Sequence, residues 1–230
     1  IGGIAIAHNG NLTNTNFLRE EFIKDGAIFQ STSDTEVILH LISRSRGDLI
    51  DRLIYSLHSI KGADSLLLMT KDCLIAVRDP VGIRPLVIGK LNDAYVFSSE
   101  SCGLDIIGAE LVRDVEPGEI IVVKNNRLES IKPFSKSYLR PCLFEYIYFA
   151  RPDSILDGRN VYQVRKKIGH ELASENFGDR EKIDVVIPIP DSGNASALGY
   201  AEKIGRNFDL GIIRNHYTGR TFIQESNTIR

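Results

Sequence analysis

An asparagine and a glycine near the start of the chain could together stabilise a negative charge. Asn9 offers a side-chain NH2 group, and Gly10 offers a backbone N–H that no side chain shields. Two such donors side by side form an oxyanion hole, the part of an acyl-transfer site that stabilises developing negative charge. The alternative is a plain turn, because Asn-Gly between apolar runs is a strong hairpin signal. The motif alone leaves both interpretations open.

A carboxylate at the start of a predicted helix is the second candidate. Ser33 and Glu36 have the spacing of a capping box, which makes Asp34 the first helical residue. Its carboxylate would then project beyond the helix end, free to bind an ammonium group. The alternative is that Asp34 only interacts favourably with the helix dipole.

A strand–loop–helix pattern in the second half of the chain could hold an anion. Asp191, Ser192 and Gly193 follow an apolar run over 184–190 and precede a predicted helix over 195–204. Backbone N–H groups at such a helix start can bind phosphate or pyrophosphate. The loop is neither a Walker A nor a GxGxxG motif, and an ordinary strand–helix connection is the alternative.

A basic loop near the end of the chain is the last candidate. Arg214, His216, Tyr217 and Arg220 surround a single glycine. Two arginines beside a hinge could close over a phosphorylated ligand. The alternative is a solvated surface loop, which composition alone slightly favours.

Helices and then a run of strands are predicted around the candidates in the first part of the chain. Apolar periodicity predicts helices over 15–24, from residue 33 and from residue 48. A buried strand is expected over 3–7, ended by a turn at Asn9-Gly10. Further strands are predicted over 65–70, 73–78, 85–89, 94–98 and 120–124. This is an α+β pattern with mostly antiparallel pairing.

The pattern of predicted elements changes near Ser135. A helix over 161–176 precedes an apolar strand over 184–190, a helix over 195–204 and a strand over 210–213. The last three elements form a predicted βαβ unit. The apolar run over 184–190 suits a sheet that is covered on both faces.

Composition narrows the class of protein. The 230 residues are 43% hydrophobic and 25% charged with a net charge of −2, which does not indicate a nucleic-acid-binding face. The apolar runs are too short to span a membrane. Three cysteines without a CxxC pair, Cys73, Cys102 and Cys142, favour a reducing, cytoplasmic setting. Because both ends interrupt a pattern, we expect an internal fragment.

In combination and in order, these segments resemble the amidophosphoribosyltransferase family. Its glutamine-dependent enzymes catalyse the first step of purine biosynthesis. Four segments are similar to its class II glutamine amidotransferase domain: 6–12, 32–36, 78–86 and 98–101. Residues 144–154 are similar to its joining segment. Two further segments, 188–193 and 217–224, are similar to the front of its phosphoribosyltransferase domain.

The resemblance implies a fold for each part of the chain. Residues 1–135 are expected to form an α+β, class II (Ntn-type) glutamine amidotransferase domain with stacked antiparallel sheets. Residues 136–160 would be the joining segment. Residues 161–230 would begin an α/β type I phosphoribosyltransferase domain.

The resemblance also implies a two-site reaction and roles for the candidates. Glutamine is hydrolysed at one site, and its ammonia attacks phosphoribosyl pyrophosphate at the other. Asn9 and Gly10 would form the oxyanion hole, and Asp34 would hold the α-amino group of glutamine. The expected phosphoribosyl pyrophosphate contacts are Asp191, Ser192, Gly193, Arg214, Tyr217 and Arg220, with Mg²⁺ near Ser192.

Other expected partners follow from the same resemblance. Purine nucleotides would act as feedback inhibitors of a homo-oligomer. Cys142 stands where some members have one ligand of a [4Fe–4S] cluster, and a buried structural thiol is the alternative. We expect neither a nucleic acid nor a membrane as a partner.

Departures from the family pattern limit the expected activity. The family's nucleophile is an N-terminal cysteine, and none of Cys73, Cys102 or Cys142 carries a free amine. The segments Arg-Tyr-Ser-Thr and Val-Asp-Asp-Ser are absent, so the 230-residue chain is predicted to be inactive by itself. Arg214 and His216 replace other residues of the family's loop. Another class II enzyme, or a degenerate nucleotide-binding paralogue, is the alternative.

Overall fold

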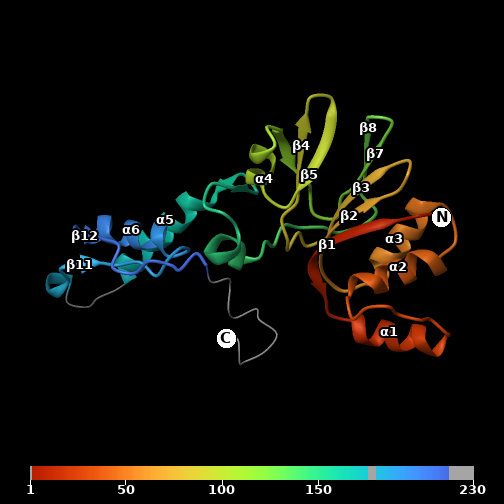
Figure 1. Cartoon of the computed structure of the whole chain (residues 1–230), viewed down its shortest axis with the longest axis horizontal. Coiled ribbons are helices and arrows are strands. Elements are labelled where there is room, and N and C mark those ends of the chain that lie inside the picture. Colours follow the sequence, from red (N-terminus) through yellow and green to blue (C-terminus); the bar gives the residue numbers. More distant parts are fainter. Residues whose placement is uncertain (1, 176–179, 218–230) are drawn as a thin grey trace. The chain divides into compact units, whose positions relative to one another are not determined.

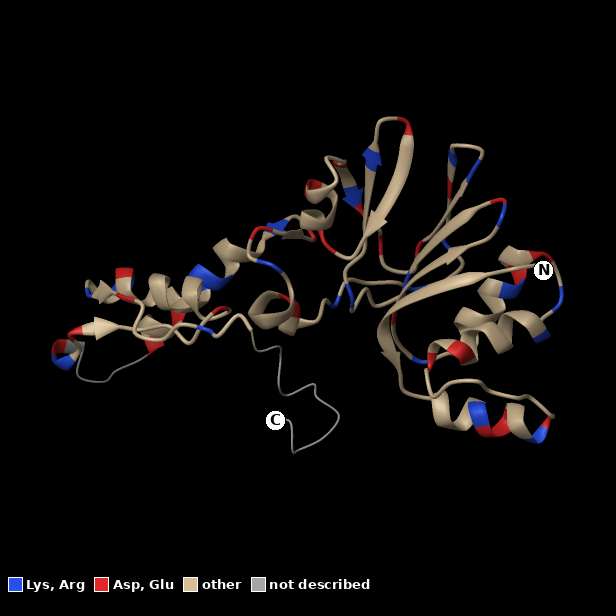
Figure 2. Cartoon of the chain, in the orientation of Figure 1, with Lys and Arg blue, Asp and Glu red and all other residues tan. Residues whose placement is uncertain are grey.

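The computed structural model describes residues 2–175 and 180–217 (Figure 1). These residues form two compact units. The first comprises the described residues within 1–145 and 149–158, and the second comprises those within 146–148 and 159–230. Acidic and basic residues are interspersed along the described chain (Figure 2). Within the described ranges, none of the helices has the length and apolarity needed to span a membrane.

A five-stranded antiparallel sheet organises the first unit, in the order β1-β2-β3-β7-β8. β1 lies at one edge of this sheet. Its strands are β1 (Ala5–Leu12), β2 (Gly62–Met69), β3 (Leu74–Arg78), β7 (Ile120–Lys124) and β8 (Arg127–Ile131).

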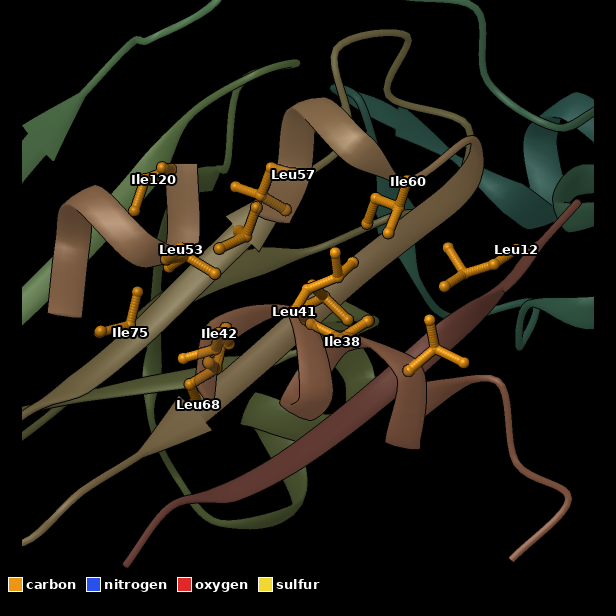
Figure 3. Close-up of a cluster of buried hydrophobic side chains, with 13 residues drawn as sticks. Leu12, Ile38, Leu41, Ile42, Leu53, Leu57, Ile60, Leu68, Ile75 and Ile120 are labelled. Atoms are coloured by element: carbon orange, nitrogen blue, oxygen red, sulfur yellow. The ribbon is translucent and has the colours of Figure 1, made fainter. Parts of the chain in front are cut away.

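Three helices accompany this sheet. The second and third bury an apolar cluster together with its strands (Figure 3), and the first packs against the second. The three helices are α1 (Thr15–Lys24), α2 (Thr35–Arg44) and α3 (Leu49–Ser59). The predicted helix positions and the predicted buried side of α2 are confirmed. That side comprises Val37, Ile38, Leu41 and Ile42, all buried. Asp48 caps α3 by accepting a hydrogen bond from the Asp51 N–H.

A second, three-stranded antiparallel sheet packs against the five-stranded one. Its order is β5-β4-β6, with β4 (Val87–Leu91), β5 (Ala94–Ser98) and β6 (Glu110–Asp114). Ile88 of β4 shares a buried cluster with Ala76 of β3 and Ile121 of β7. The predicted stacked antiparallel sheets are therefore confirmed. β6, β8 and the short helix α4 (Ser101–Ile106) were not predicted from the sequence.

The chain from residue 145 to residue 160 contains only short elements. They are the π-helical turn η1 (Glu145–Phe149), β9 (Ile155–Leu156) and β10 (Arg159–Asn160). Side chains of the first unit hold part of this segment. Buried Arg78 donates to both carboxylate oxygens of Asp157, at 2.9 and 3.3 Å.

The second unit contains the predicted βαβ unit. β11 (Val185–Val186) and β12 (Asn207–Phe208) pair in parallel, and α6 (Asn194–Ile204) connects them. α5 (Val161–Glu175) packs against α6, and a 3-10 turn, η2 (Arg180–Lys182), precedes β11. Gly199 lies so close to the Lys166 carbonyl oxygen that a Cβ there would collide with it.

Two strand predictions in this unit are wrong in extent or place. The apolar run over 184–190 pairs only at Val185 and Val186, because Pro188 and Pro190 have no N–H to donate to a sheet. The second parallel strand lies at 207–208, ahead of the predicted 210–213. Gly211 interrupts the predicted segment and weakens any strand there.

Candidate functional site

Asn9 and Gly10 lie inside β1 and form no turn. Asn9 is opposite Ser65 and Gly10 is opposite Asp64 in the antiparallel pairing with β2. The hairpin interpretation is therefore wrong. The strand predicted over 3–7 is present from Ala5 onward, but it is not buried, since Ala5 and Ala7 are exposed. The local turn signal of Asn-Gly is overridden by pairing with a strand more than fifty residues away.

The free edge of β1 carries the Gly10 N–H. Successive N–H groups of a strand point to alternate sides. The Leu12 N–H points away from β2 and donates to Asp34 Oδ2 at 3.0 Å, whereas the Thr13 N–H donates to Lys61 on the β2 side. Gly10, two residues before Leu12, therefore directs its N–H to the same open edge as Leu12.

Close packing at this point requires glycine. A Cβ on Gly10 would collide with the Ala63 carbonyl oxygen and lie 2.6 Å from His8 Nε2. The His8 ring is itself fixed, because Nδ1 lies 3.2 Å from Thr35 Oγ1 and its side chain is only 3% exposed. Contacts with β2 and with α2 thus fix this part of the β1 backbone.

The Asn9 side-chain amide has a fixed orientation. Its Oδ1 accepts hydrogen bonds from Arg84 Nε at 3.0 Å and Nη2 at 2.7 Å. Its Nδ2 donates to Ser99 Oγ at 3.0 Å. An amide NH2 has two hydrogens, so one remains for a ligand. Neither Arg84 nor Ser99, which lie 75 and 90 residues further along the chain, was predicted to contact Asn9.

Asp34 is the residue before α2 and not its first helical residue, so that prediction is wrong. The predicted capping box is wrong as well. Glu36 turns back to accept the N–H groups of Gln30 and Ser31, at 2.8 and 2.9 Å, and leaves Ser33 without its predicted partner in the box. The Asp34 carboxylate is partly engaged, because it binds Leu12 N–H and lies 3.5 Å from His8 Nδ1.

The structure therefore brings together the three candidates of the first unit. The N–H groups of Gly10 and Leu12 are two residues apart, roughly 7 Å along a strand. Asp34, 25% exposed, marks the Leu12 end of this edge, and the Asn9 and Gly10 donors mark the other. The arrangement suits an extended amino acid whose amino group meets Asp34 and whose side-chain carbonyl meets the two donors.

A buried carboxyl group, that of Asp64, lies opposite Gly10 on the neighbouring strand β2. Burial, and then the nearby Asp79 carboxylate, raise the pKa of Asp64 to about 8. Burial also raises the pKa of Asp79, but the N–H groups of Val81 and Ile83, which Asp79 accepts at 2.9 and 3.1 Å, oppose that rise. Asp64 is then mostly protonated near pH 7, so little negative charge opposes an oxyanion at Gly10. The sequence signal was an acid before the apolar run Leu66–Leu67–Leu68.

The candidates of the second unit are more open. Asp191 Oδ2 lies 3.0 Å from Arg214 Nη1, and both side chains are about half exposed. Gly193 is the residue before α6, and its N–H donates to the Ile189 carbonyl at 3.1 Å. The Asn194 N–H donates to the Asp191 carbonyl at 3.3 Å, so fewer loop donors face outward than predicted. Tyr217 is fully exposed, and Arg220 lies outside the described residues.

The described residues contain no cluster of three or more His, Cys, Asp or Glu side chains able to hold a metal ion. A [4Fe–4S] cluster needs four thiolates, and the whole chain has three cysteines. The Cys142 N–H donates to the Ile83 carbonyl at 2.9 Å, which ties this residue to the first unit. The described residues alone therefore do not fit such a cluster.

Comparison with known proteins agrees with this geometry. Residues 1–105 match the model of a family described as a glutamine amidotransferase domain. An amidophosphoribosyltransferase of Rhizobium etli is 54% identical over 100% of this chain and 47% of its own length. The Bacillus subtilis amidophosphoribosyltransferase is 47% identical over 100% of this chain and 48% of its own length.

A solved structure supports the same relationship. The glutamine phosphoribosylpyrophosphate amidotransferase of B. subtilis, complexed with ADP and GMP, superposes with a TM-score of 0.90 at 45% identity. The match covers 98% of this chain and 49% of that one, so the chain spans about half the length of these relatives. Residues 1–105 are thus similar to a glutamine amidotransferase domain, and the chain as a whole is similar to about half of an amidophosphoribosyltransferase.

Proposed function

We propose that the complete protein containing this chain moves the amide nitrogen of glutamine onto phosphoribosyl pyrophosphate. Glutamine, water and phosphoribosyl pyrophosphate would give glutamate, 5-phosphoribosylamine and pyrophosphate. The observation that carries the proposal is the open edge of β1. The Gly10 N–H and the oriented Asn9 amide lie there with the Asp34 carboxylate.

Each of these groups has a distinct task in glutamine hydrolysis. Asp34 binds the α-amino group, with one carboxylate oxygen also fixed by the Leu12 N–H. As a nucleophile attacks the side-chain amide carbon, negative charge develops on the carbonyl oxygen. The Asn9 and Gly10 donors stabilise that charge without having to reorganise, which is where electrostatic catalysis gains most. By the family resemblance, the nucleophile is an N-terminal cysteine.

The second unit would bind the phosphorylated substrate. Asp191, Ser192 and Gly193 precede α6, whose N-terminus favours anions. Arg214 would exchange its contact with Asp191 for phosphate oxygens, and Tyr217 and Arg220, which follow it in the sequence, would be further contacts. Mg²⁺ keeps waters and binds through substrate phosphates with few protein ligands, so the Ser192 hydroxyl suits a supporting contact.

The remaining partners are proposed by analogy with the relatives. The solved B. subtilis enzyme is complexed with ADP and GMP, and we infer that purine nucleotides bind this protein as well. A homo-oligomer in the cytoplasm is part of the same proposal.

The proposal is tested on the complete protein by measuring glutamate and pyrophosphate release together. We expect both products in equal amounts when glutamine and phosphoribosyl pyrophosphate are present, and ammonia should replace glutamine. The 230-residue chain alone should release no glutamate. Nucleotide binding by the complete protein without either product would instead support a regulatory paralogue and overturn the proposal.

A further inference from the structure

A partly exposed arginine connects the candidate oxyanion hole to a more distant, buried carboxylate. Arg84 donates two hydrogen bonds to Asn9 Oδ1 and lies 2.7 Å from Glu145 Oε1 through its remaining terminal nitrogen. We propose that Arg84, held by Glu145, is a positioning residue that fixes the Asn9 amide with its NH2 group toward the substrate. This inference rests on the glutaminase activity proposed above.

The chemistry of the two side chains determines which way the amide faces. The oxygen and nitrogen of an asparagine amide are nearly equal in size, so packing alone does not choose between the two orientations. The arginine side chain has only hydrogen-bond donors. Arg84 can therefore donate to the oxygen of Asn9 but disfavours its NH2 group at the same place. The Ser99 hydroxyl then takes one amide hydrogen, at 3.0 Å, and the other is left for an oxyanion.

The opposite orientation would damage the site twice. It would place the NH2 group of Asn9 against the Arg84 guanidinium, with no acceptor there. It would also direct the amide oxygen toward the developing negative charge, where it repels instead of stabilising. Arg84 therefore selects the one orientation that is useful for an oxyanion hole.

Arg84 is itself held on several sides. The Glu145 side chain is 5% exposed, and the Arg84 guanidinium also lies 5.1 Å from the centre of the Phe149 ring. The Arg84 carbonyl accepts hydrogen bonds from buried Arg78 at 3.0 Å and from Ser65 at 3.2 Å. The backbone carbonyl and the guanidinium of Arg84 are thus both fixed. The side chain is therefore restricted in its rotamers and holds Asn9 in one orientation.

Glu145 depends on Arg84 in return. Burial raises the pKa of Glu145, and the positive charge of Arg84 opposes that rise. Replacing Arg84 leaves a buried carboxylate without its countercharge as well as an Asn9 without its anchor. Residues 145 and 149 follow the first unit's sheets in the chain, so the orientation of Asn9 depends on a segment far from β1 in sequence.

The test compares variants of the complete protein in the glutaminase reaction. Arg84→Ala should lower kcat about 10- to 100-fold and change KM for glutamine by less than about 3-fold, because only the transition state uses the oriented amide. Ammonia-dependent synthesis should stay within about 2-fold of wild type. Arg84→Lys, which offers one ammonium in place of two fixed N–H donors, should recover part of kcat.

A matched control separates positioning from general damage. Arg113 makes a comparable two-bond contact with Glu119, at 2.7 and 2.8 Å, and touches neither Asn9 nor Arg84 in the described contacts. Arg113→Ala should lower thermal stability and leave glutaminase kcat unchanged. If both arginine variants lower kcat equally, Arg84 has only a structural role and the inference fails.

A double-mutant cycle provides the decisive comparison. If Arg84 acts through Asn9, Arg84→Ala should lower kcat no further in an Asn9→Ala background. Independent, multiplicative losses would overturn the inference. A wild-type protein that releases no glutamate would refute the proposed function instead. In that case, the side-chain NH2 resonances of Asn9 still test positioning: loss of their distinct, slowly exchanging signals in Arg84→Ala supports it, and unchanged signals refute it.

Discussion

The edge of β1 and the loop before α6 differ in how firmly their functional side chains are held. At the β1 edge, each functional group has a fixed neighbour: Asn9 has Arg84 and Ser99, and Asp34 has Leu12. At the loop before α6, Asp191 and Arg214 pair with each other, and both are about half exposed.

The difference follows from what each site is proposed to do. Stabilising a transition-state charge requires donors that are already in place, since reorganisation during the reaction costs free energy. Binding a highly charged phosphate ester allows the ligand itself to order an exposed pair. The first region should therefore be sensitive to small changes in packing and protonation, and the second should respond mainly to its ligand.

The largest expected effect concerns protonation behind the β1 edge. Because the pKa of Asp64 is raised to about 8, the folded protein keeps a proton that the unfolded chain loses near pH 4. Stability is therefore lost as pH rises from about 4 to 8, by on the order of a few kcal/mol. Asp64→Asn should flatten this loss in thermal melts taken across that range.

Glu119 provides the opposite case in the same unit. Burial alone would raise its pKa, but hydrogen bonds from Arg113, Ser130 and the Glu116 N–H lower it to about 2. Glu119→Gln should therefore remove stability that is present above about pH 4.5 and lost in acid. Similar pH profiles for the two variants would contradict the assigned protonation states.

The next effect tests close packing at the β1 edge. Gly10→Ala should destabilise the protein by about 1–3 kcal/mol and abolish most glutaminase activity, because its Cβ collides with the Ala63 carbonyl. Gly3→Ala is the matched control, since a Cβ at Gly3 meets nothing within 4 Å. Chemical denaturation measures the free energy of unfolding, and glutamate release measures the glutaminase activity. Equal behaviour of the two variants would show that the edge is not tightly packed.

A smaller effect separates substrate binding from catalysis within the first region. Asp34→Asn should raise KM for glutamine about 10-fold or more, because a charge-assisted contact with the ammonium group is lost. It should lower stability by only about 1 kcal/mol, since the amide oxygen can still accept the Leu12 N–H. Steady-state kinetics that show a lower kcat at unchanged KM would place Asp34 elsewhere in the reaction.

The smallest effect on stability belongs to the second region. Asp191→Asn removes an exposed ion pair with Arg214 and should change the free energy of unfolding by less than about 1 kcal/mol. The same variant should weaken phosphoribosyl pyrophosphate binding, measured by calorimetry on the complete protein. A large loss of stability with unchanged binding would mean that the pair is structural.

The sequence predicted the local features of the fold and missed the contacts between distant segments. The four-residue spacing of Leu18 and Phe22 and the apolar side of α2 followed from helical periodicity, and both pack into the same core. The Asn-Gly turn failed because pairing with β2 decides the conformation of β1. No local pattern shows that Asn9 meets Arg84 and Ser99, because strand pairing and sheet stacking create those contacts.

The central claim is that Asn9 on β1 supplies an oxyanion donor for glutamine hydrolysis. The most direct measurement is glutaminase kcat of the complete protein with Asn9→Ala, beside its ammonia-dependent activity. We expect kcat to fall about 10²- to 10³-fold, as for the loss of one oxyanion donor, with ammonia-dependent activity retained. Glutaminase kcat equal to that of the wild type would contradict the claim.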